Sequence, residues 1–193
     1  MSLRERIMKI FEVCLDVNKF QGFLWDTDGV SVFPYPRFVG TPIDRKTWPP
    51  GKVISLLPKG PKPDVWTVGL GSGAFAINLC AHPALEMFGE MAGELLPLPF
   101  NEETLSVFNI LQCLDCLDED ATEWKQLVTT GQRRVVTPCI RASRLTSSTL
   151  FKSAHNPFNF YCWENEADPE YEFKACVEAN GITGLFFKEV LVS

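Results

Sequence analysis

Carboxylates crowd one stretch of this chain and are the residues whose spacing most invites a chemical interpretation. Seven acids lie between Glu102 and Glu123, and the stretch contains no Lys or Arg. Paired carboxylates can act as general acid and base, but nothing in the pattern fixes their mutual geometry. The spacing of Asp118 and Asp120 falls short of a calcium loop. Such a run is ordinarily a solvated face, and the functional alternative is a docking surface for a basic protein partner.

The residue after this run could complete such a surface. Trp124 directly follows Glu123, and tryptophan is a typical anchor of protein interfaces. Its alternative role is simply to fill the core. The predicted partner-binding residues are Asp115, Asp118, Glu119, Asp120, Glu123 and Trp124. A second group of acids, between Glu164 and Glu172, leaves open which of the two groups contacts a partner.

A glycine-rich segment at 69–74, with the sequence GLGSGA, invites comparison with dinucleotide-binding turns. That fingerprint needs a strand, the glycine turn and then a helix whose N-terminus meets the pyrophosphate. Here the residues after the glycines alternate with strand period, and Pro83 would interrupt a helix begun at Ala74. We therefore expect a hairpin turn. A small enzyme or nucleotide-binding domain that uses this turn is the alternative function.

The histidines and cysteines form no recognisable catalytic or metal-binding motif. His82 and His155 are the two histidines, and the chain has neither a G-x-S-x-G elbow nor an H-E-x-x-H motif. Cys113 and Cys116 form the one CxxC pair, whereas a zinc site would need a second pair. The seven cysteines are odd in number and no secretion signal is visible, so we expect free thiols. We predict no catalytic, cofactor-binding or metal-binding residues.

Length and composition place these residues in one ordinary folded domain. The chain has 193 residues, of which 46% are hydrophobic and 22% charged, as in soluble globular proteins. Its net charge of −6 disfavours binding of nucleic acids through their phosphates. No apolar run approaches the ~18 residues needed to span a bilayer. We therefore expect a cytoplasmic location and neither a nucleic-acid nor a membrane partner.

Side-chain periodicity predicts an α+β fold, mostly antiparallel or mixed sheet with two short helices. Alternation over 7–17 favours a first strand, with a helix over 2–12 as the alternative. The segment from Asp115 to Trp124 is expected to be an acidic turn that could open a short helix. Further strands are expected at 64–69, 75–79, 104–113, 133–140, 145–151, 158–163 and 185–192.

Both helices are predicted from residues that favour helix ends. Proline suits the first turn, aspartate caps the N-terminus, and glycine adopts the left-handed conformation that ends a helix. The expected boundary residues are Pro83 and Gly93 for a helix at 83–92, and Asp168, Pro169 and Asn180-Gly181 for a helix at 169–179.

Prolines interrupt the chain before these helices. Eight of the 14 prolines lie within residues 34–63, where no long helix or central strand can form. We expect an extended connection, broken by a short apolar piece from Val53 to Leu57. Trp48 and Leu56-Leu57 are expected to hold it to the body. A domain linker is the alternative, but the preceding 33 residues are too few for an independent domain, so residues 1–193 are expected to form one domain.

Three segments, in this order, are similar to one known protein family. They are Pro63-Asp-Val-Trp-Thr-Val-Gly-Leu-Gly-Ser-Gly, then Glu94-Leu-Leu-Pro-Leu-Pro-Phe with Leu114-Asp-Cys-Leu-Asp-Glu-Asp, and the closing Phe173-Lys-Ala-Cys-Val-Glu-Ala-Asn-Gly-Ile-Thr-Gly-Leu-Phe-Phe-Lys-Glu-Val. Over residues 50–190 the chain resembles family eleven of the immunity proteins of bacterial polymorphic toxin systems. Members often carry Lys-Ser after the acidic turn, where this chain has Ala121-Thr-Glu-Trp124.

The resemblance implies a non-enzymatic protein that binds and neutralises a toxin encoded beside it. Such a protein would act in the cytoplasm and form a 1:1 or 2:2 complex, with a homodimer as one arrangement. The resemblance assigns no catalytic residue and no cofactor to this chain. Inhibition of this kind needs a shaped and charged surface rather than reactive groups, which suits a chain that lacks catalytic motifs.

Overall fold

The first strand shows how alternating side chains build the core of this protein. The computed structural model describes residues 8–25, 38–48, 52–69, 71–128, 131–165 and 167–193. Strand β1 spans Ile10–Leu15, and its Phe11 and Val13 enter one buried cluster while Ile10 enters another on the opposite face. The predicted strand is therefore confirmed over its described part. Residues 2–7 of the alternative helix lie outside the described residues.

A six-stranded mixed sheet has the strand order β3-β2-β4-β5-β7-β6. All neighbouring strands are antiparallel except β2 and β4, which are parallel. The strands are β2 (Gly22–Trp25), β3 (Val53–Leu56), β4 (Val65–Val68), β5 (Phe75–Ile77), β6 (Gly93–Phe100) and β7 (Glu103–Ile110). The hairpin of β4 and β5 confirms that the glycine-rich segment is a turn between antiparallel strands and does not lead into a helix.

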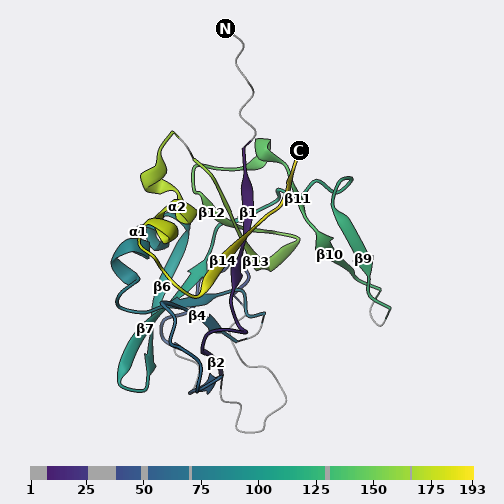
Figure 1. Ribbon diagram of the computed structural model, residues 1–193. Coiled ribbons are helices and arrows are strands. Elements are labelled where there is room, and N and C mark those ends of the chain that lie inside the picture. The colour runs from purple at the N-terminus through teal and green to yellow at the C-terminus, as the bar shows by residue number, and fades with distance from the viewer. Residues whose placement is uncertain (1–7, 26–37, 49–51, 70, 129–130, 166) are drawn as a thin grey trace.

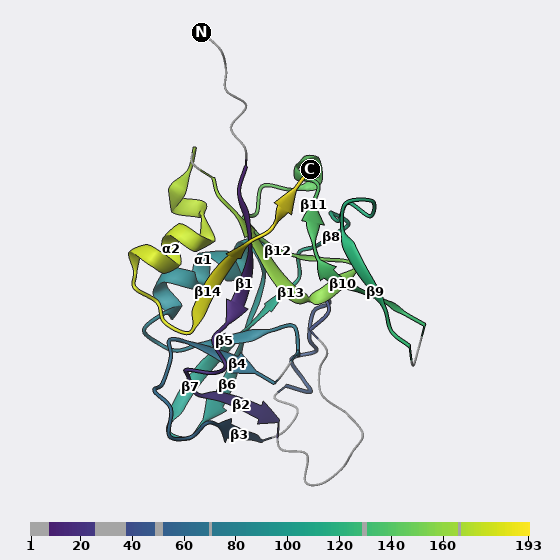
Figure 2. The same cartoon turned by 45° about the vertical axis from the view of Figure 1, so that its right-hand side comes forward.

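A five-stranded sheet has the order β14-β1-β13-β12-β8, and two smaller sheets lie beside it. Within it only β12 and β8 are parallel. Its other strands are β8 (Cys113–Leu114), β12 (Leu150–Ser153), β13 (Asn156–Trp163) and β14 (Leu185–Glu189). The smaller sheets pair β9 (Glu123–Gln126) antiparallel with β10 (Arg133–Thr137), and β11 (Cys139–Ile140) parallel with β15 (Leu191–Val192). Figure 1 and Figure 2 both show β9 and β10 projecting away from the rest of the chain.

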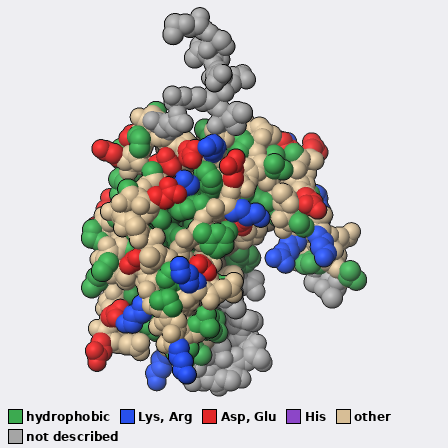
Figure 3. Space-filling model, in the orientation of Figure 1, with side chains coloured by type: hydrophobic (Ala, Val, Ile, Leu, Met, Phe, Trp, Pro, Cys, Tyr) green, Lys and Arg blue, Asp and Glu red, His purple; other side chains and the backbone are tan. Residues whose placement is uncertain are grey.

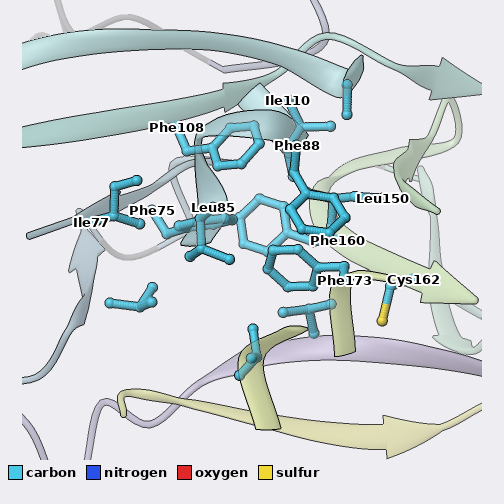
Figure 4. Close-up of a cluster of buried hydrophobic side chains, with 14 of the residues drawn as sticks. Phe75, Ile77, Leu85, Phe88, Phe108, Ile110, Leu150, Phe160, Cys162 and Phe173 are labelled. Carbon is cyan, nitrogen blue, oxygen red and sulfur yellow. The ribbon is translucent and has the colours of Figure 1, made fainter. Parts of the chain in front are cut away.

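Two α-helices of the described residues complete this α+β fold, α1 (His82–Ala92) and α2 (Phe173–Ala179). They pack against each other beside the sheets (Figure 1), and both sheets and both helices contribute to one core. Figure 4 shows the rings at its centre. Phe75 packs edge-on against Phe160 at 5.4 Å between ring centroids, and Phe88 packs against Phe173 at 5.3 Å. Each buried ring stabilises the fold by about 2 kcal/mol. Among the described residues, no helix is long and apolar enough to cross a membrane.

The second helix begins later than predicted, and a different residue caps it. Asp168 makes no side-chain capping bond, and a short 3-10 turn occupies Pro169–Tyr171 before α2. The hydroxyl of Thr149, buried beside β12, accepts from the Phe173 N–H at 3.3 Å and donates to the Tyr171 carbonyl at 2.6 Å. A cap from a residue so distant in sequence cannot be recognised by a local pattern. The predicted end is confirmed, because Gly181 has a φ of 61°.

The first helix also ends differently from the prediction. Gly93 is extended, with φ −172°, and it opens strand β6 instead of forming a left-handed stop. A side chain at this position would meet the Asn109 carbonyl oxygen 2.1 Å from its Cβ, so close packing against β7 explains the glycine. Strand β6 itself was not predicted. Pro97 and Pro99 are tolerated because β6 is an edge strand and both face solvent.

Five further segments differ from the sequence predictions. The acidic turn leads into strand β9, not into a helix. Pro138 divides the predicted strand 133–140 into β10 and β11, and the predicted strand 145–151 begins only at Leu150, after a 3-10 turn at Ala142–Arg144. The predicted final strand is interrupted at Val190 between β14 and β15. Strand β2 was not expected at all.

The proline-rich stretch is held to the body at Trp48, as predicted. The Trp48 indole donates to the Pro97 carbonyl at 2.6 Å and packs edge-on against Trp25 at 5.7 Å between ring centroids. Of the second predicted anchor, Leu56 is partly buried in β3 opposite Gly22 of β2, whereas Leu57 is half-exposed. Strand β3 forms within this stretch, which is therefore not wholly an extended connection. Residues 34–37 and 49–51 lie outside the described residues.

Candidate docking surface

The six predicted partner-binding residues occupy one continuous stretch at the base of the projecting hairpin. We call residues 123–137, which contain β9 and β10, the arm. Asp115, Asp118, Glu119 and Asp120 lie in the loop between β8 and the arm, while Glu123 and Trp124 begin β9. Thr122 fixes this base, because its hydroxyl accepts from the Cys139 N–H at 3.1 Å. The hydrogen bond between Thr122 and Cys139 therefore fixes the backbone from which these side chains project.

Asp118 is the one acid of the set whose carboxylate is fully engaged. It accepts from the Arg141 guanidinium at 3.2 Å and from the Ser193 hydroxyl at 2.9 Å, and the amides of Asp120 and Ala121 also donate to it. These bonds, that from Arg141 first, lower the pKa of Asp118 to about 2. Its side chain is only 16% exposed. Asp118 thus holds its loop to Arg141, which follows β11, and to Ser193. Its role in the fold is structural.

Asp115 and Glu119 flank one histidine ring. His155, in the turn between β12 and β13, has Nδ1 3.6 Å from an Asp115 oxygen and Nε2 3.8 Å from a Glu119 oxygen. Its ring also lies edge-on to Trp124, at 6.2 Å between ring centroids. Each acid also has an arginine neighbour, because Arg144 lies 2.5 Å from Asp115 and Arg133 lies 3.9 Å from Glu119.

We call this group the His155 platform; it consists of Asp115, Glu119, Trp124, Arg133, Arg144 and His155. The sequence predicted an acidic face because no Lys or Arg lies among the acids from 102 to 123. The structure corrects that prediction: the cations come from residues 133–155, and the surface is mixed in charge. The pairs are mostly exposed, so each contributes little to stability and can exchange for a partner's charges.

Trp124 is half-buried and joins the platform to the core. Its ring packs against the cluster formed by Ile10, Phe151 and Tyr161, while its Nε1 donates to the Glu119 carbonyl at 3.1 Å. The Arg133 guanidinium lies 4.3 Å from the ring centroid, in cation–π geometry. The two predicted roles of Trp124, core and surface anchor, are both compatible with this position, because one side of the ring is packed and the rest is accessible.

The sequence analysis predicted one strand of the arm, within residues 133–140, but missed β9 and its pairing with β10. The arm's cations Lys125 and Arg134 are Cα partners in the strand register and both are exposed. Figure 3 shows Lys and Arg side chains gathered on the projecting hairpin. Gly131, with a φ of 67°, lies between its strands, and residues that favour strands flank it, Trp124 on one side and Val135 and Val136 on the other. That combination is a hairpin signal, and it could have located the arm.

The cysteines and His82 have surroundings that are typical of structural residues. Burial raises the pKa of the Cys113 thiol and raises that of Cys116 to about 11, which is the opposite of a reactive thiol. All seven cysteines are free, as expected. In the described part of the chain, no group of three or more His, Cys, Asp or Glu side chains is placed to hold a metal ion. His82 lies 4.0 Å from Glu86, one turn along α1.

In the second acidic group, Glu164 is the acid with cationic neighbours among the described side chains. It lies 4.0 Å from Lys9 and 3.9 Å from Lys174. Glu172 is buried, and burial raises the pKa of its carboxyl. Glu166 lies outside the described residues. No projecting hairpin accompanies these acids in the described chain, so the first group is the stronger candidate for a partner.

The glycine turn contributes to a buried cation site. Lys152 is 0% exposed, and its Nζ donates to the carbonyls of Phe38 and Gly73, each at 2.6 Å. The Phe160 ring lies 5.7 Å away, and burial lowers the pKa of Lys152 to about 8. A Cβ on Gly73 would lie 2.4 Å from the Phe38 oxygen, so the glycine lets these two carbonyls approach one ammonium. The contact joins β12 to the glycine turn, across the two large sheets.

No protein-family model matches the chain, and no curated protein matches it. The resemblance to the immunity-protein family therefore remains a prediction that rests on the three segments themselves. In the structure the first and last of these segments meet. The Asp64 carboxylate accepts from the Thr183 amide at 2.9 Å and from its hydroxyl at 2.7 Å, and Asn78 also donates to it. These two segments thus hold the fold together at a point distinct from the His155 platform.

Proposed function

We propose that this chain is a non-enzymatic binding protein of the immunity type, which neutralises a cytoplasmic protein toxin by docking against it. The observation that carries the proposal is the His155 platform at the base of the arm. There a half-buried tryptophan is surrounded by exposed charges of both signs. Protein interfaces characteristically combine an aromatic anchor with a charged rim that can be re-paired on binding.

The arrangement also suits an inhibitor in its rigidity. The loop is fastened by Asp118 and Thr122, and the platform side chains hold one another through ion pairs and ring contacts. A preorganised surface loses less conformational entropy when it binds, which favours tight inhibition. The three segments that resemble the immunity family suggest the class of the partner, a toxin encoded beside this chain.

Co-expression tests the proposal. The product of the adjacent reading frame is induced in a bacterial host with and without this chain, and growth and co-purification are measured. We expect the chain to rescue growth and to co-purify with the toxic product. If the product kills equally well in the presence of the folded chain, immunity to that neighbour is wrong.

A single substitution then asks whether the platform is the docking site. Trp124→Ala is expected to weaken the complex about 30-fold, the usual effect of losing an aromatic anchor. Phe186→Ala removes an exposed aromatic ring on β14, outside both acidic groups, and is the matched control that should leave affinity unchanged. Circular dichroism and thermal melting establish that both variants are folded. Equal affinity of wild type and Trp124→Ala would move the docking site elsewhere.

A further inference from the structure

The arm carries cations that the fold leaves unbalanced. Between residues 133 and 144, three of the four arginines face carboxylates: Arg133 faces Glu119, Arg141 faces Asp118 and Arg144 faces Asp115. Arg134 and Lys125 form no ion pair with any side chain in the described ranges. Asp115, Asp118 and Glu119 at the base of the arm already face other arginines, and no carboxylate of the described residues lies within ion-pair distance of Lys125 or Arg134.

The register makes this arrangement unfavourable for the free protein. Lys125 and Arg134 are directly opposite each other on an antiparallel pair, where like charges repel and destabilise the strands. A two-stranded hairpin is marginal even without such repulsion. A glutamate at either position would provide a favourable cross-strand pair. The chain therefore keeps a locally costly arrangement on its most projecting element.

Exposed apolar side chains accompany the cations. Val128 is fully exposed and Val136, at the irregularity in β10, is 48% exposed. Valine beside lysine and arginine is an amphipathic surface, which suits a folded protein better than a phosphate backbone. The net charge of −6 and the acids at the base of the arm also disfavour nucleic acid. The complementary partner has carboxylates around an apolar patch.

We propose that the arm docks onto an acidic patch of the toxin, with Lys125 and Arg134 pairing with the toxin's carboxylates and Val128 and Val136 covering apolar surface between them. This inference rests on the proposed function for the identity of the partner. It reverses the polarity expected from the acidic run: the chain approaches its partner with a basic element, and the platform acids take up the cations nearest to the arm's base.

A simpler explanation is that charges on the arm merely discourage pairing of its free strand edges with other chains. The two explanations differ in the sign of charge that they require. Protection of an edge is equally good with glutamate, whereas recognition of an acidic patch is lost. Charge reversal therefore separates them, and it can be read without knowing the toxin.

The first test titrates the isotope-labelled chain with a polyglutamate peptide, and separately with a phosphodiester oligonucleotide of equal charge, at low salt. We expect the peptide to shift the backbone amide signals of the arm, and the effect to disappear in Lys125→Glu/Arg134→Glu. The matched control, Lys46→Glu/Lys59→Glu, makes the same change in net charge at two exposed lysines elsewhere and should bind at the arm like wild type. Tighter binding of the oligonucleotide at the arm, or peptide shifts that the control abolishes equally, would overturn the inference.

The second test uses the toxin that co-purifies with the chain. The arm variant should associate at least about ten-fold more slowly than wild type at low salt, with a weaker salt dependence, whereas the control variant should not. Binding of wild type with equal rates for both variants would remove the arm from the interface and leave the proposed function standing. Absence of wild-type binding would reject the proposed function, while the polyglutamate titration still decides on the arm.

Discussion

Two regions of this protein differ in how their cationic side chains are partnered. Lys152 is buried, yet its ammonium donates to two carbonyls at 2.6 Å and lies near an aromatic ring. Lys125 and Arg134 are exposed, and they face each other across the arm without a counter-ion among the described side chains. Where burial makes a charge expensive, the fold supplies two carbonyl acceptors and a nearby ring. Where water can screen the charge, the fold places two cations opposite each other.

The difference separates positions that stabilise the fold from positions available for a partner. Asp64 belongs with Lys152, because three groups donate to its carboxylate and it joins two distant segments. Asp118 also belongs there, although it lies in the predicted partner-binding stretch. The arm and the exposed part of the platform form the other class. Substitutions in the first class should therefore lower the free energy of unfolding, whereas substitutions in the second class should change the association with the toxin.

The largest expected effect is at Lys152. Lys152→Ala would leave two buried carbonyls without their donor and open a cavity in the seam between the sheets. We expect the free energy of unfolding to fall by about 3 kcal/mol or more, measured by urea denaturation. Lys152→Met, which keeps the length of the side chain, should cost less. A loss below about 1 kcal/mol in Lys152→Ala would show that these contacts do not hold the two large sheets together.

The titration of Lys152 gives this region a characteristic pH dependence. Folding lowers its pKa from 10.5 to about 8, so protonation opposes the folded state. The penalty is absent above the unfolded pKa, grows as the pH falls from 10.5 towards 8, and is constant below that. Wild type should therefore gain about 3 kcal/mol relative to Lys152→Met between pH 8 and pH 10.5. Cys116 and Tyr161, whose pKa values burial raises, act in the opposite direction but occur in both proteins and cancel. A constant difference across this range would contradict a buried, titrating ammonium.

Asp64 should have the next largest effect. Asp64→Ala removes the acceptor for the Thr183 amide and hydroxyl and for Asn78, and we expect a loss of about 1–3 kcal/mol in urea denaturation. Burial alone would raise the pKa of Asp64, but these bonds outweigh it and lower the pKa below 3.8. Its contribution is therefore present at neutral pH and is lost as the pH falls below the unfolded value. Thr183→Val, which removes only the hydroxyl, should cost less than Asp64→Ala; the reverse order would be inconsistent with these contacts.

Asp118 tests the boundary between the two classes. Asp118→Asn should lower the thermal midpoint and speed amide exchange in the loop before the arm, because it loses the charge that faces Arg141. Since the pKa of Asp118 is lowered from 3.8 to about 2, wild type should lose this advantage as the pH falls through that interval. Association with the toxin should change less than in Trp124→Ala. A variant of normal stability that binds poorly would place Asp118 in the interface instead.

The smallest expected effect has the opposite sign. Lys125→Glu places a carboxylate opposite Arg134, so the arm should become more stable and its amide exchange up to about five-fold slower. The same substitution should slow association with the toxin. Gain of local stability with loss of binding would sharpen the contrast between the two cationic regions. Unchanged or faster exchange in the arm would show that the opposed charges carry no cost in the free protein.

Sequence reasoning succeeded where neighbouring residues decide the structure. Glycines at 69, 71 and 73, all with positive φ, and the alternation after them identified a hairpin turn instead of a nucleotide-binding turn. The helix that begins near Pro83 was found in the same way. Both depend on interactions within a few residues, which local pattern and turn chemistry describe well.

The same reasoning was wrong where residues that are distant in the sequence interact. Arg141 and Arg144 neutralise acids that lie more than 20 residues earlier, so a run without Lys or Arg became a surface of mixed charge. Thr149 caps a helix that Asp168 was expected to cap. The strand order of the sheets, and the opposition of Lys125 to Arg134, likewise follow from register and tertiary packing, which one sequence does not reveal.

Amide hydrogen exchange of the chain, free and in complex with the toxin that co-purifies with it, tests the docking surface most directly. The account predicts that protection on binding concentrates in residues 115–135, which include the predicted acids, Trp124 and most of the arm, and extends to the turn at His155. Asp64 and Lys152 should exchange alike in both states. Protection confined to another surface, such as the edge strands β3 or β6, with the arm unchanged, would contradict it.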